Sequence, residues 1–243
     1  MIETLHSAEE LEQAVRRLGF LPFFHSPIPG LSIEEHTSAD YWFQEGVDGP
    51  WEWKGPVIRE WNCTYGKFFC GKAGYVSLEW FPDWANYHRA GYRIDAAPLD
   101  ADGRNRERLM YDTIVAHESL LAREIKALCG LRRPTKTLFD PTAGTLPAKK
   151  PARSRGEGFE SAMTHLQMAT LVVIADFEYA LDKHDRPYGW GLARYTTPEA
   201  LFGEELLKAC GRRTPEESKL RIAEHLQKIA PQATEKQILK IIG

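Results

Sequence analysis

The sequence lacks the features that would place it at once among membrane, secreted or metal-binding proteins. No apolar run approaches the roughly 18–20 residues of a membrane span. The start, "MIETLHSAEELEQAVRRLGF", contains acidic residues throughout, unlike a signal or transit peptide. The four cysteines form no C-x-x-C pair, and the eight histidines show no metal-like pair on one helix face. We therefore expect a cytoplasmic protein with reduced thiols, no membrane partner, no metal and no cofactor.

The motifs of several large enzyme classes are missing as well. There is no G-x-S-x-G nucleophile motif, no P-loop and no dinucleotide-binding fingerprint. The composition is ordinary for a globular protein, with 43% hydrophobic and 27% charged residues. Helical and β-rich segments follow one another along the chain, which predicts an α+β fold with a sizeable core.

Charge is distributed unevenly behind a net value of −3. Residues 1–100 hold 8 Lys and Arg against 15 Asp and Glu, whereas residues 101–160 hold 12 against 8. Within residues 123–155 the ratio is 9 basic to 2 acidic. Such a segment favours contact with a polyanion such as DNA, although a solvated loop explains the same composition. The candidate nucleic-acid-binding residues are Arg132, Arg133, Lys136, Lys149, Lys150, Arg153 and Arg155.

Tryptophan is concentrated in "VDGPWEWKGPVIREW", residues 47–61, which holds three of the chain's seven. On a strand, Trp51 and Trp53 face the same side, where they either stack on a base or fill a core. We favour the core, with Gly-Pro pairs forming turns at both ends of the stretch. The alternative is a ligand pocket made of Trp51, Trp53, Glu52 and Asp48.

Carboxylates are also dense upstream of the tryptophans, at Glu34, Glu35 and Asp40 beside His36. Two carboxylates that face one pocket can act as general acid and base, as in glycoside hydrolysis. A solvated acidic face accounts for the same residues and is the favoured interpretation.

Local signals predict several elements. Ser7 and Glu10 form a capping box before an apolar repeat that ends at Gly19. A hairpin is expected at "KFFCGKAGYVSLEWF", turning between Gly71 and Gly74. Capping boxes that begin at Thr214 and Thr234 predict two C-terminal helices.

The middle of the chain predicts one or two helices, an irregular basic loop, a helix and two strands joined by a turn. This is the order of a winged helix, in which one helix contacts the DNA major groove and a hairpin wing lies beside it. We therefore expect three parts. They are a Trp-rich α+β portion at residues 1–104, a winged-helix-like module at 105–203, and C-terminal helices at 204–243 that pack on the rest.

The stretch "FESAMTHLQMATLVVIADFEYALDKHDRPYGWGLARYTTPEALFG", residues 159–203, resembles a known group. The chain, including "DGPWEWKGP", "YGKFFCGKAGY" and "LKIIG", is similar to the small bacterial AlkZ-related proteins, relatives of the winged-helix alkylpurine DNA glycosylases. The resemblance to the small group implies a fold more than a reaction. The likeness to the larger glycosylases covers residues 105–203 and implies DNA binding and a connection with DNA repair.

Those glycosylases carry a Gln-x-Gln or Gln-x-Asp motif that leads into a β-branched run and serves hydrolysis of the damaged nucleotide. In "LQMATLVVIADF" this resemblance assigns Gln167 as the catalytic residue, while Ala169 stands where the second polar residue is expected. Release of a base requires a polar or acidic group that activates water, and an alanine supplies none.

Three hypotheses follow from the sequence. The leading one is a nucleic-acid-binding winged-helix protein, connected with DNA repair. The second is a divergent DNA glycosylase or other hydrolase that uses the Trp-rich N-terminal pocket. The third is a protein-interaction module in which the wing and the basic loop dock an acidic partner.

Overall fold

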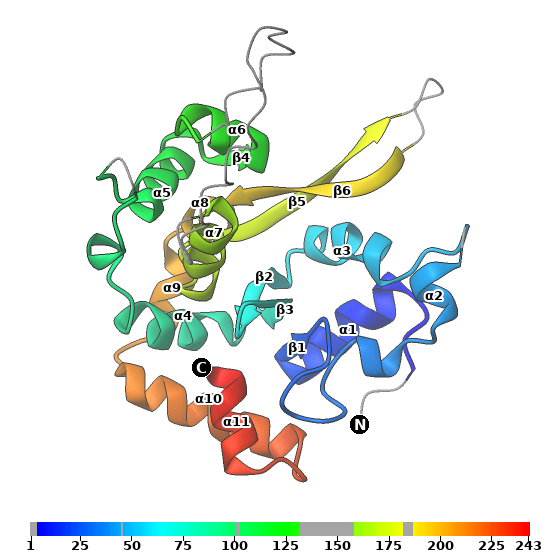
Figure 1. The fold of residues 1–243 in the computed structure, drawn as a ribbon. Coiled ribbons are helices and arrows are strands. Elements are labelled where there is room, and N and C mark those ends of the chain that lie inside the picture. Colours follow the sequence, from blue (N-terminus) through cyan, green and yellow to red (C-terminus); the bar gives the residue numbers. More distant parts are fainter. Residues whose placement is uncertain (1–3, 45, 101–102, 132–157, 182–186) are drawn as a thin grey trace, which may run out of the picture.

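Two three-stranded antiparallel sheets organise the described part of the chain, and each is built by a different half of the sequence. The computed structural model describes residues 4–44, 46–100, 103–131, 158–181 and 187–243. The first sheet has the order β1-β3-β2 and the second the order β4-β6-β5. Helices surround both sheets, so the expected α+β fold is confirmed (Figure 1).

The N-terminal half contains α1, the first sheet and α4. Its elements are α1 (Ala8–Leu18), β1 (Phe20–Pro22), a 3-10 turn (Glu34–His36), α2 (Asp40–Phe43), α3 (Pro50–Arg59), β2 (Cys63–Phe69), β3 (Lys72–Ser77), α4 (Phe81–Ala90) and a second 3-10 turn (Ile94–Ala96). The Ser7 hydroxyl accepts from the Glu10 backbone N–H, and Gly19 ends α1 at a φ of 78°. The predicted first helix is therefore confirmed.

The hairpin of β2 and β3 is confirmed, but its turn is tighter than predicted. Phe69 pairs with Lys72, so the turn consists of Cys70 and Gly71, whose φ angles are 52° and 78°. Two successive positive φ angles are the geometry of a type I′ turn, which suits the twist of a hairpin. Gly74 lies inside β3, opposite Gly66.

The Trp-rich stretch is a helix, so the prediction of a strand is wrong. Gly49 caps α3, its backbone N–H donates to Glu52 Oε2 at 3.0 Å, and Pro50 occupies the first turn. Proline is well placed there because the backbone N–H groups of the first helical turn have no acceptor within the helix. A residue without an N–H therefore loses no hydrogen bond. The second Gly-Pro pair lies within α3 instead of forming a turn. Local capping and burial outweigh the β propensity of the aromatic residues.

The second half of the chain contains the second sheet. Its elements are α5 (Arg106–His117), β4 (Ser119–Leu121), α6 (Ala122–Leu128), α7 (Phe159–Met168), β5 (Val173–Leu181), β6 (Pro187–Thr196), α8 (Pro198–Phe202), α9 (Glu205–Lys208), α10 (Pro215–Ile229) and α11 (Glu235–Ile242). The two strands predicted after α7 are confirmed. The short strand β4 was not predicted, and it begins after Glu118, whose φ of 62° ends α5.

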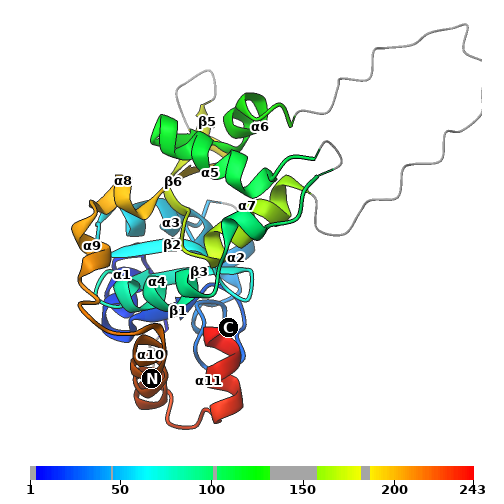
Figure 2. The same ribbon diagram turned by 90° about the vertical axis from the view of Figure 1, so that its left-hand side faces the viewer.

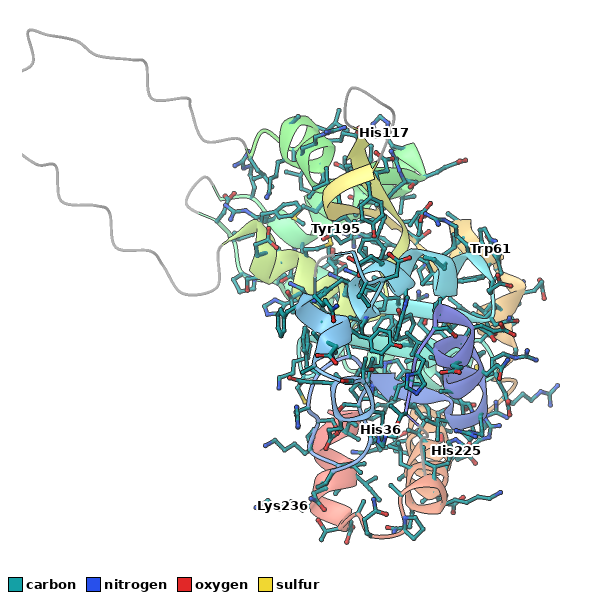
Figure 3. The ribbon with its side chains drawn as sticks, turned by 90° about the vertical axis from the view of Figure 1, so that its right-hand side faces the viewer. His36, Trp61, His117, Tyr195, His225 and Lys236 are labelled. Atoms are coloured by element: carbon teal, nitrogen blue, oxygen red, sulfur yellow. The ribbon has the colours of Figure 1, made fainter. Side chains whose placement is uncertain are left out.

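The two C-terminal helices lie side by side and pack on the rest of the molecule beneath α4 (Figures 1 and 2). Thr214 and Thr234 cap them as predicted. His117, at the end of α5, and Lys236, on α11, mark opposite ends of the molecule (Figure 3). No helix within the described ranges is both long and apolar enough to cross a bilayer.

Candidate functional site at the junction of α4, α5 and α7

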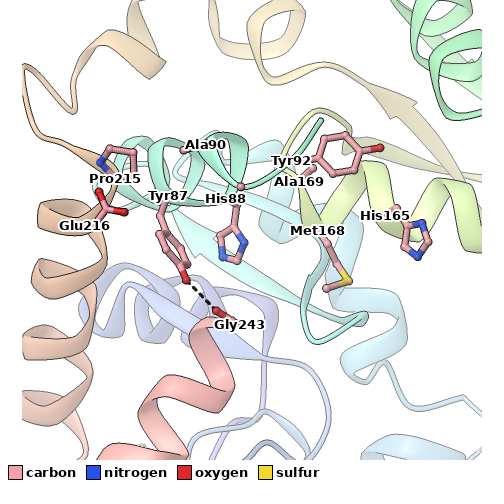
Figure 4. Close-up of a pocket in the computed structure, with 11 residues that line it drawn as sticks. Tyr87, His88, Ala90, Tyr92, His165, Met168, Ala169, Pro215, Glu216 and Gly243 are labelled. Atoms are coloured by element: carbon pink, nitrogen blue, oxygen red, sulfur yellow. Dashed lines mark hydrogen bonds between the residues drawn. The ribbon is translucent and has the colours of Figure 1, made fainter. Parts of the chain in front are cut away.

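A cavity of about 550 Å³ lies where the ends of α4, α7 and α11 meet the start of α10. Its lining combines aromatic, imidazole and small apolar groups, among them Tyr87, His88, Tyr92, His165, Met168 and Ala169 (Figure 4). The volume falls within the range of small-molecule sites, which are mostly apolar with a few placed polar groups. The lining also includes one carboxylate, that of Glu216 at the start of α10.

A buried carboxylate stands behind this cavity. Asn105 caps α5 by accepting from the Arg108 backbone N–H, which places Glu107 in the first helical turn. Glu107 is only 6% exposed. Its Oε1 lies 2.7 Å from Nδ1 of His165 on α7, and its Oε2 accepts a short hydrogen bond from the Tyr92 hydroxyl. Three segments thus meet at one carboxylate.

Tyr92, Glu107 and His165 form a trio, and the chemistry of each group decides where the protons of its hydrogen bonds lie. Burial, together with the neighbouring Glu107, raises the pKa of Tyr92 well above its usual value. The phenol therefore keeps its proton and donates a hydrogen bond to the carboxylate. A carboxylate only accepts hydrogen bonds, so the proton of the second contact lies on Nδ1 of His165. In the neutral imidazole this leaves Nε2 as a proton acceptor, and the His165 side chain is 48% exposed.

The second imidazole of the cavity has a different environment. Burial lowers the pKa of His88 to about 4. The ring lies against Trp84, with centroids 4.6 Å apart, and against Tyr87, whose hydroxyl donates to the Gly243 carbonyl at 3.0 Å. At neutral pH His88 is an uncharged wall of the cavity that also supports the end of α11.

Comparison with known proteins places the whole chain in one family. The AlkZ-related family model matches residues 5–243. The chain belongs to the AlkZ-related family. No curated protein and no solved structure matches it. The resemblance inferred from the sequence is therefore confirmed at the level of the family.

In this AlkZ-related protein, Gln167 lies two residues from His165 but points to another face of α7. It is 1% exposed, its Oε1 accepts from the Lys67 backbone N–H at 3.1 Å, and its Nε2 donates to the Met163 carbonyl at 3.2 Å. The side chain joins α7 to β2. Ala169, at the position of the missing polar residue, lines the cavity. A catalytic role for Gln167 stays a prediction.

The two tryptophan residues of α3 lie in different surroundings, because positions two apart on a helix face different sides. Trp53 is 4% exposed and packs against Tyr41, which confirms the expected burial of this ring. Trp51 is half-buried among Phe23, Phe24 and Trp42. Glu52 and Asp48 are exposed, and Glu52 caps the helix. The four candidate pocket residues are therefore distributed over core, cap and surface.

The upstream carboxylates are engaged locally. Glu34 Oε2 accepts from the His25 backbone N–H at 2.8 Å, which lowers the pKa of Glu34, and Glu35 accepts from Ser32 and from the Gly30 backbone N–H. These bonds fix the loop before α2. The seven basic candidates all lie outside the described residues: Arg132, Arg133, Lys136, Lys149, Lys150, Arg153 and Arg155. Within the described ranges, no group of three or more His, Cys, Asp or Glu residues could hold a metal ion.

Sequence reasoning missed the trio of Tyr92, Glu107 and His165. Glu107 and His165 are 58 positions apart, and Tyr92 precedes Glu107 by 15. Asn105 followed by acidic residues marks a helix start, but such a signal says nothing about which distant imidazole the carboxylate meets. The packing of α5 against α7 brings Glu107 and His165 together, and the segment after α4 adds Tyr92.

Proposed function

We propose that this AlkZ-related protein binds DNA through residues 105–203, in connection with DNA repair, and that this part is a winged-helix module. The observation that carries the proposal is the element order α5-β4-α6-α7-β5-β6 with the antiparallel sheet β4-β6-β5. In a winged helix, the third helix meets the major groove and the hairpin beside it forms the wing. Here these roles fall to α7 and to β5–β6. Residues 1–104 and 204–243 form the flanking parts.

The surface of α7 fits that assignment. Ala162, Met163 and Leu166 bury one side of the helix, whereas Glu160 and His165 are exposed on the other. The β5–β6 hairpin extends from the body of the molecule (Figure 1). The basic segment directly precedes α7 in the sequence. Its cations are therefore only a few residues along the chain from the helix that would approach the phosphates.

Salt-dependent binding of a fluorescent duplex tests the proposal. Each neutralised phosphate releases counterions, so affinity falls with salt and each lost contact reduces the log–log slope by about 1. Reversing Arg132 and Arg133 to Glu should weaken binding and reduce the slope by about 2. The double variant Lys228→Glu with Lys236→Glu makes the same charge change on the exposed C-terminal helices and should leave the slope unaltered.

The outcome separates DNA binding from the alternatives. An affinity for duplex DNA that changes neither with salt concentration nor on reversal of Arg132 and Arg133 would contradict the proposal. Equal affinity for poly-glutamate and for duplex DNA would instead indicate a module that docks acidic proteins. The geometry of the DNA backbone would then add nothing to the affinity beyond its charge.

A further inference from the structure

Trp61 is a large, exposed residue in an unfavourable backbone conformation. It is 54% exposed, and its φ of 58° lies in the left-handed region. It follows α3 closely, and its backbone N–H donates to the Ile58 carbonyl at 3.2 Å. Glycine is the usual residue just after a helix, because a side chain is strained in this conformation, and Gly19 ends α1 in the same region. Folding alone therefore favours glycine over an exposed indole at this position.

A neighbouring ring holds the indole of Trp61 in place. The ring centroid lies 5.8 Å from that of Phe202, the last residue of α8, at an interplanar angle of 83°. Such an edge-to-face pair orients a ring and leaves much of its surface in water. Trp61 lies at the edge of the molecule in Figure 3. A held, exposed tryptophan is the type of residue that anchors protein interfaces, since little of its freedom remains to be lost on binding.

An acidic groove lies next to Trp61 in the chain. Its volume is about 550 Å³, it runs between α1 and α3, and the residues on either side of Trp61 in the sequence, Glu60 and Asn62, both line it. The charged groups of its lining are three carboxylates and one guanidinium, those of Glu9, Glu12, Glu60 and Arg16. The charge of the lining is therefore negative, opposite in sign to that of the basic segment before α7.

The carboxylates of the groove differ in how free they are. Glu12 is 7% exposed, accepts from Asn62 Nδ2 at 2.7 Å and lies 3.8 Å from Arg16 Nε. Its charge is thus largely answered within the protein. Glu9 and Glu60 are exposed, and they remain available to a cationic group from outside.

We propose that Trp61 and this groove form a docking surface for an extended, basic, proline-containing segment of a partner protein. A lysine or arginine of the segment lies in the groove beside Glu9 and Glu60, and a proline packs on the exposed indole. Proline segments suit an aromatic surface because their polyproline II conformation is formed before binding. Charge complementarity sets the sign of the partner. Nucleic acid does not fit here, because its phosphates would face the carboxylates, so the surface is separate from the DNA contact proposed for α7.

Peptide titration of the full chain, followed by fluorescence anisotropy of the labelled peptide, tests the inference. A short peptide of alternating arginine and proline should bind with a Kd below about 1 mM. Replacement of its prolines by glycine should weaken binding, and replacement of its arginines by glutamate should abolish it. Added salt should also weaken binding, since the pairing charges are exposed.

Trp61→Gly separates docking from folding. Loss of a tryptophan anchor should weaken peptide binding about ten-fold or more. The melting temperature should stay within about 4 °C of the wild-type value, because relief of the left-handed strain offsets the lost contact with Phe202. Leu220→Ala removes a side chain of similar exposure, 60%, from α10 and should change neither quantity.

Glu60→Lys tests the groove. It should weaken binding of the arginine–proline peptide, whereas Glu224→Lys, the same charge change at an exposed position of α10, should not. Full affinity in Trp61→Gly or in Glu60→Lys would overturn the inference, and so would a wild-type protein that binds none of the peptides. Self-association of the chain that Trp61→Gly abolishes, measured by sedimentation, would make a second copy the occupant and overturn the assignment to a different protein.

Discussion

Among the residues that the structure describes, two carboxylates are buried in the first turn of a helix, Asp83 and Glu107, and they have different partners. Asp83, in the first turn of α4, is fully buried. It accepts from Arg213 Nε at 2.6 Å, from Ser218 Oγ at 2.8 Å and from Arg221. All three partners lie on α10 or just before it, so Asp83 anchors the C-terminal helices to α4.

Glu107 is buried almost as deeply, but its partners are a phenol and an imidazole. The imidazole opens onto a cavity, whereas the guanidinium groups around Asp83 neutralise that carboxylate inside a helix junction. A carboxylate enclosed by two fixed cations has no free direction in which to act. Glu107 instead lies between a phenol and an imidazole whose side chain is half-exposed. Burial alone therefore does not distinguish the two carboxylates, whereas their partners do.

The largest expected effect comes from breaking the Asp83 cluster. Asp83→Asn leaves two arginine side chains without their counter-charge, and removal of one partner from a buried pair typically costs about 3–5 kcal/mol. Urea unfolding of the full chain should show this loss. Asp112→Asn, on the exposed side of α5, should cost less than ~0.5 kcal/mol. Equal losses in the two variants would show that the Asp83 cluster contributes no anchoring.

Acid should loosen the same region through His88. The pKa of His88 is lowered to about 4 in the folded protein, below its ordinary value of 6.5, so between these values the unfolded chain binds the additional proton. Stability is then complete above pH 6.5 and is lost as the pH falls toward 4, by at most about 3 kcal/mol at 1.36 kcal/mol per pKa unit. His225, whose pKa is also lowered by burial, acts in the same direction.

The measurement is the difference in free energy of unfolding between pH 7 and pH 4.5. His88→Gln should show a smaller difference than the wild-type protein, while His117→Gln, at an exposed position, should show the full one. An identical pH dependence in all three proteins would contradict the assignment of the loss to His88.

Glu107→Gln should cost less stability than Asp83→Asn, about 1–2 kcal/mol, because glutamine keeps the volume and still accepts from Tyr92. Removal of the charge without the volume is the sharpest form of the comparison, since Asp83→Asn makes the same change beside two guanidinium groups. Thermal melts of Glu107→Gln beside Asp83→Asn provide the two numbers, and equal losses would contradict the comparison.

The sequence predicted what depends on neighbouring residues. Ser7, Thr214 and Thr234 were correctly assigned as helix caps because the capping bond spans three residues. The β-branched run after α7 correctly indicated strands. The Trp-rich helix was missed because aromatic residues between two Gly-Pro pairs are typical of a strand with a turn at each end. The cap formed by Gly49 and Glu52 was nevertheless present in the sequence. The strand β4 was missed because three residues show no periodicity.

The candidate site could not be predicted for a physical reason. Its geometry depends on α5 packing against α7, and a single sequence does not record which faces meet. His165 is one of eight histidines and Glu107 one of many acids in a helical first turn. The resemblance assigned Gln167, which lies two positions from His165 but bonds to the backbone of Lys67 and Met163. Its catalytic role stays a prediction.

The smallest expected effect concerns a third buried charge. Lys54, on α3, is 8% exposed, and its Nζ lies 4.4 Å from the Phe177 ring centroid and 4.9 Å from that of Trp51. Burial lowers the pKa of Lys54 to about 8. Two rings each stabilise a desolvated cation by about 0.5–2 kcal/mol, which offsets much of the cost of burial. Lys54→Met keeps the stem between the rings, so its free energy of unfolding at pH 7 should lie within about 1 kcal/mol of the wild-type value.

The pH dependence gives this last prediction its sign. Because the folded pKa is about 8 and the ordinary value is 10.5, the unfolded chain holds the additional proton between them, and the wild-type protein should gain stability as the pH rises through that window. Lys54→Met should lack the gain, and Lys236→Met, at an exposed position, should retain it. A loss above ~3 kcal/mol at pH 7 would mean that Lys54 depends on a fixed counter-charge as Asp83 does. A small change would instead establish that aromatic rings hold a buried ammonium without anchoring one part of the fold to another.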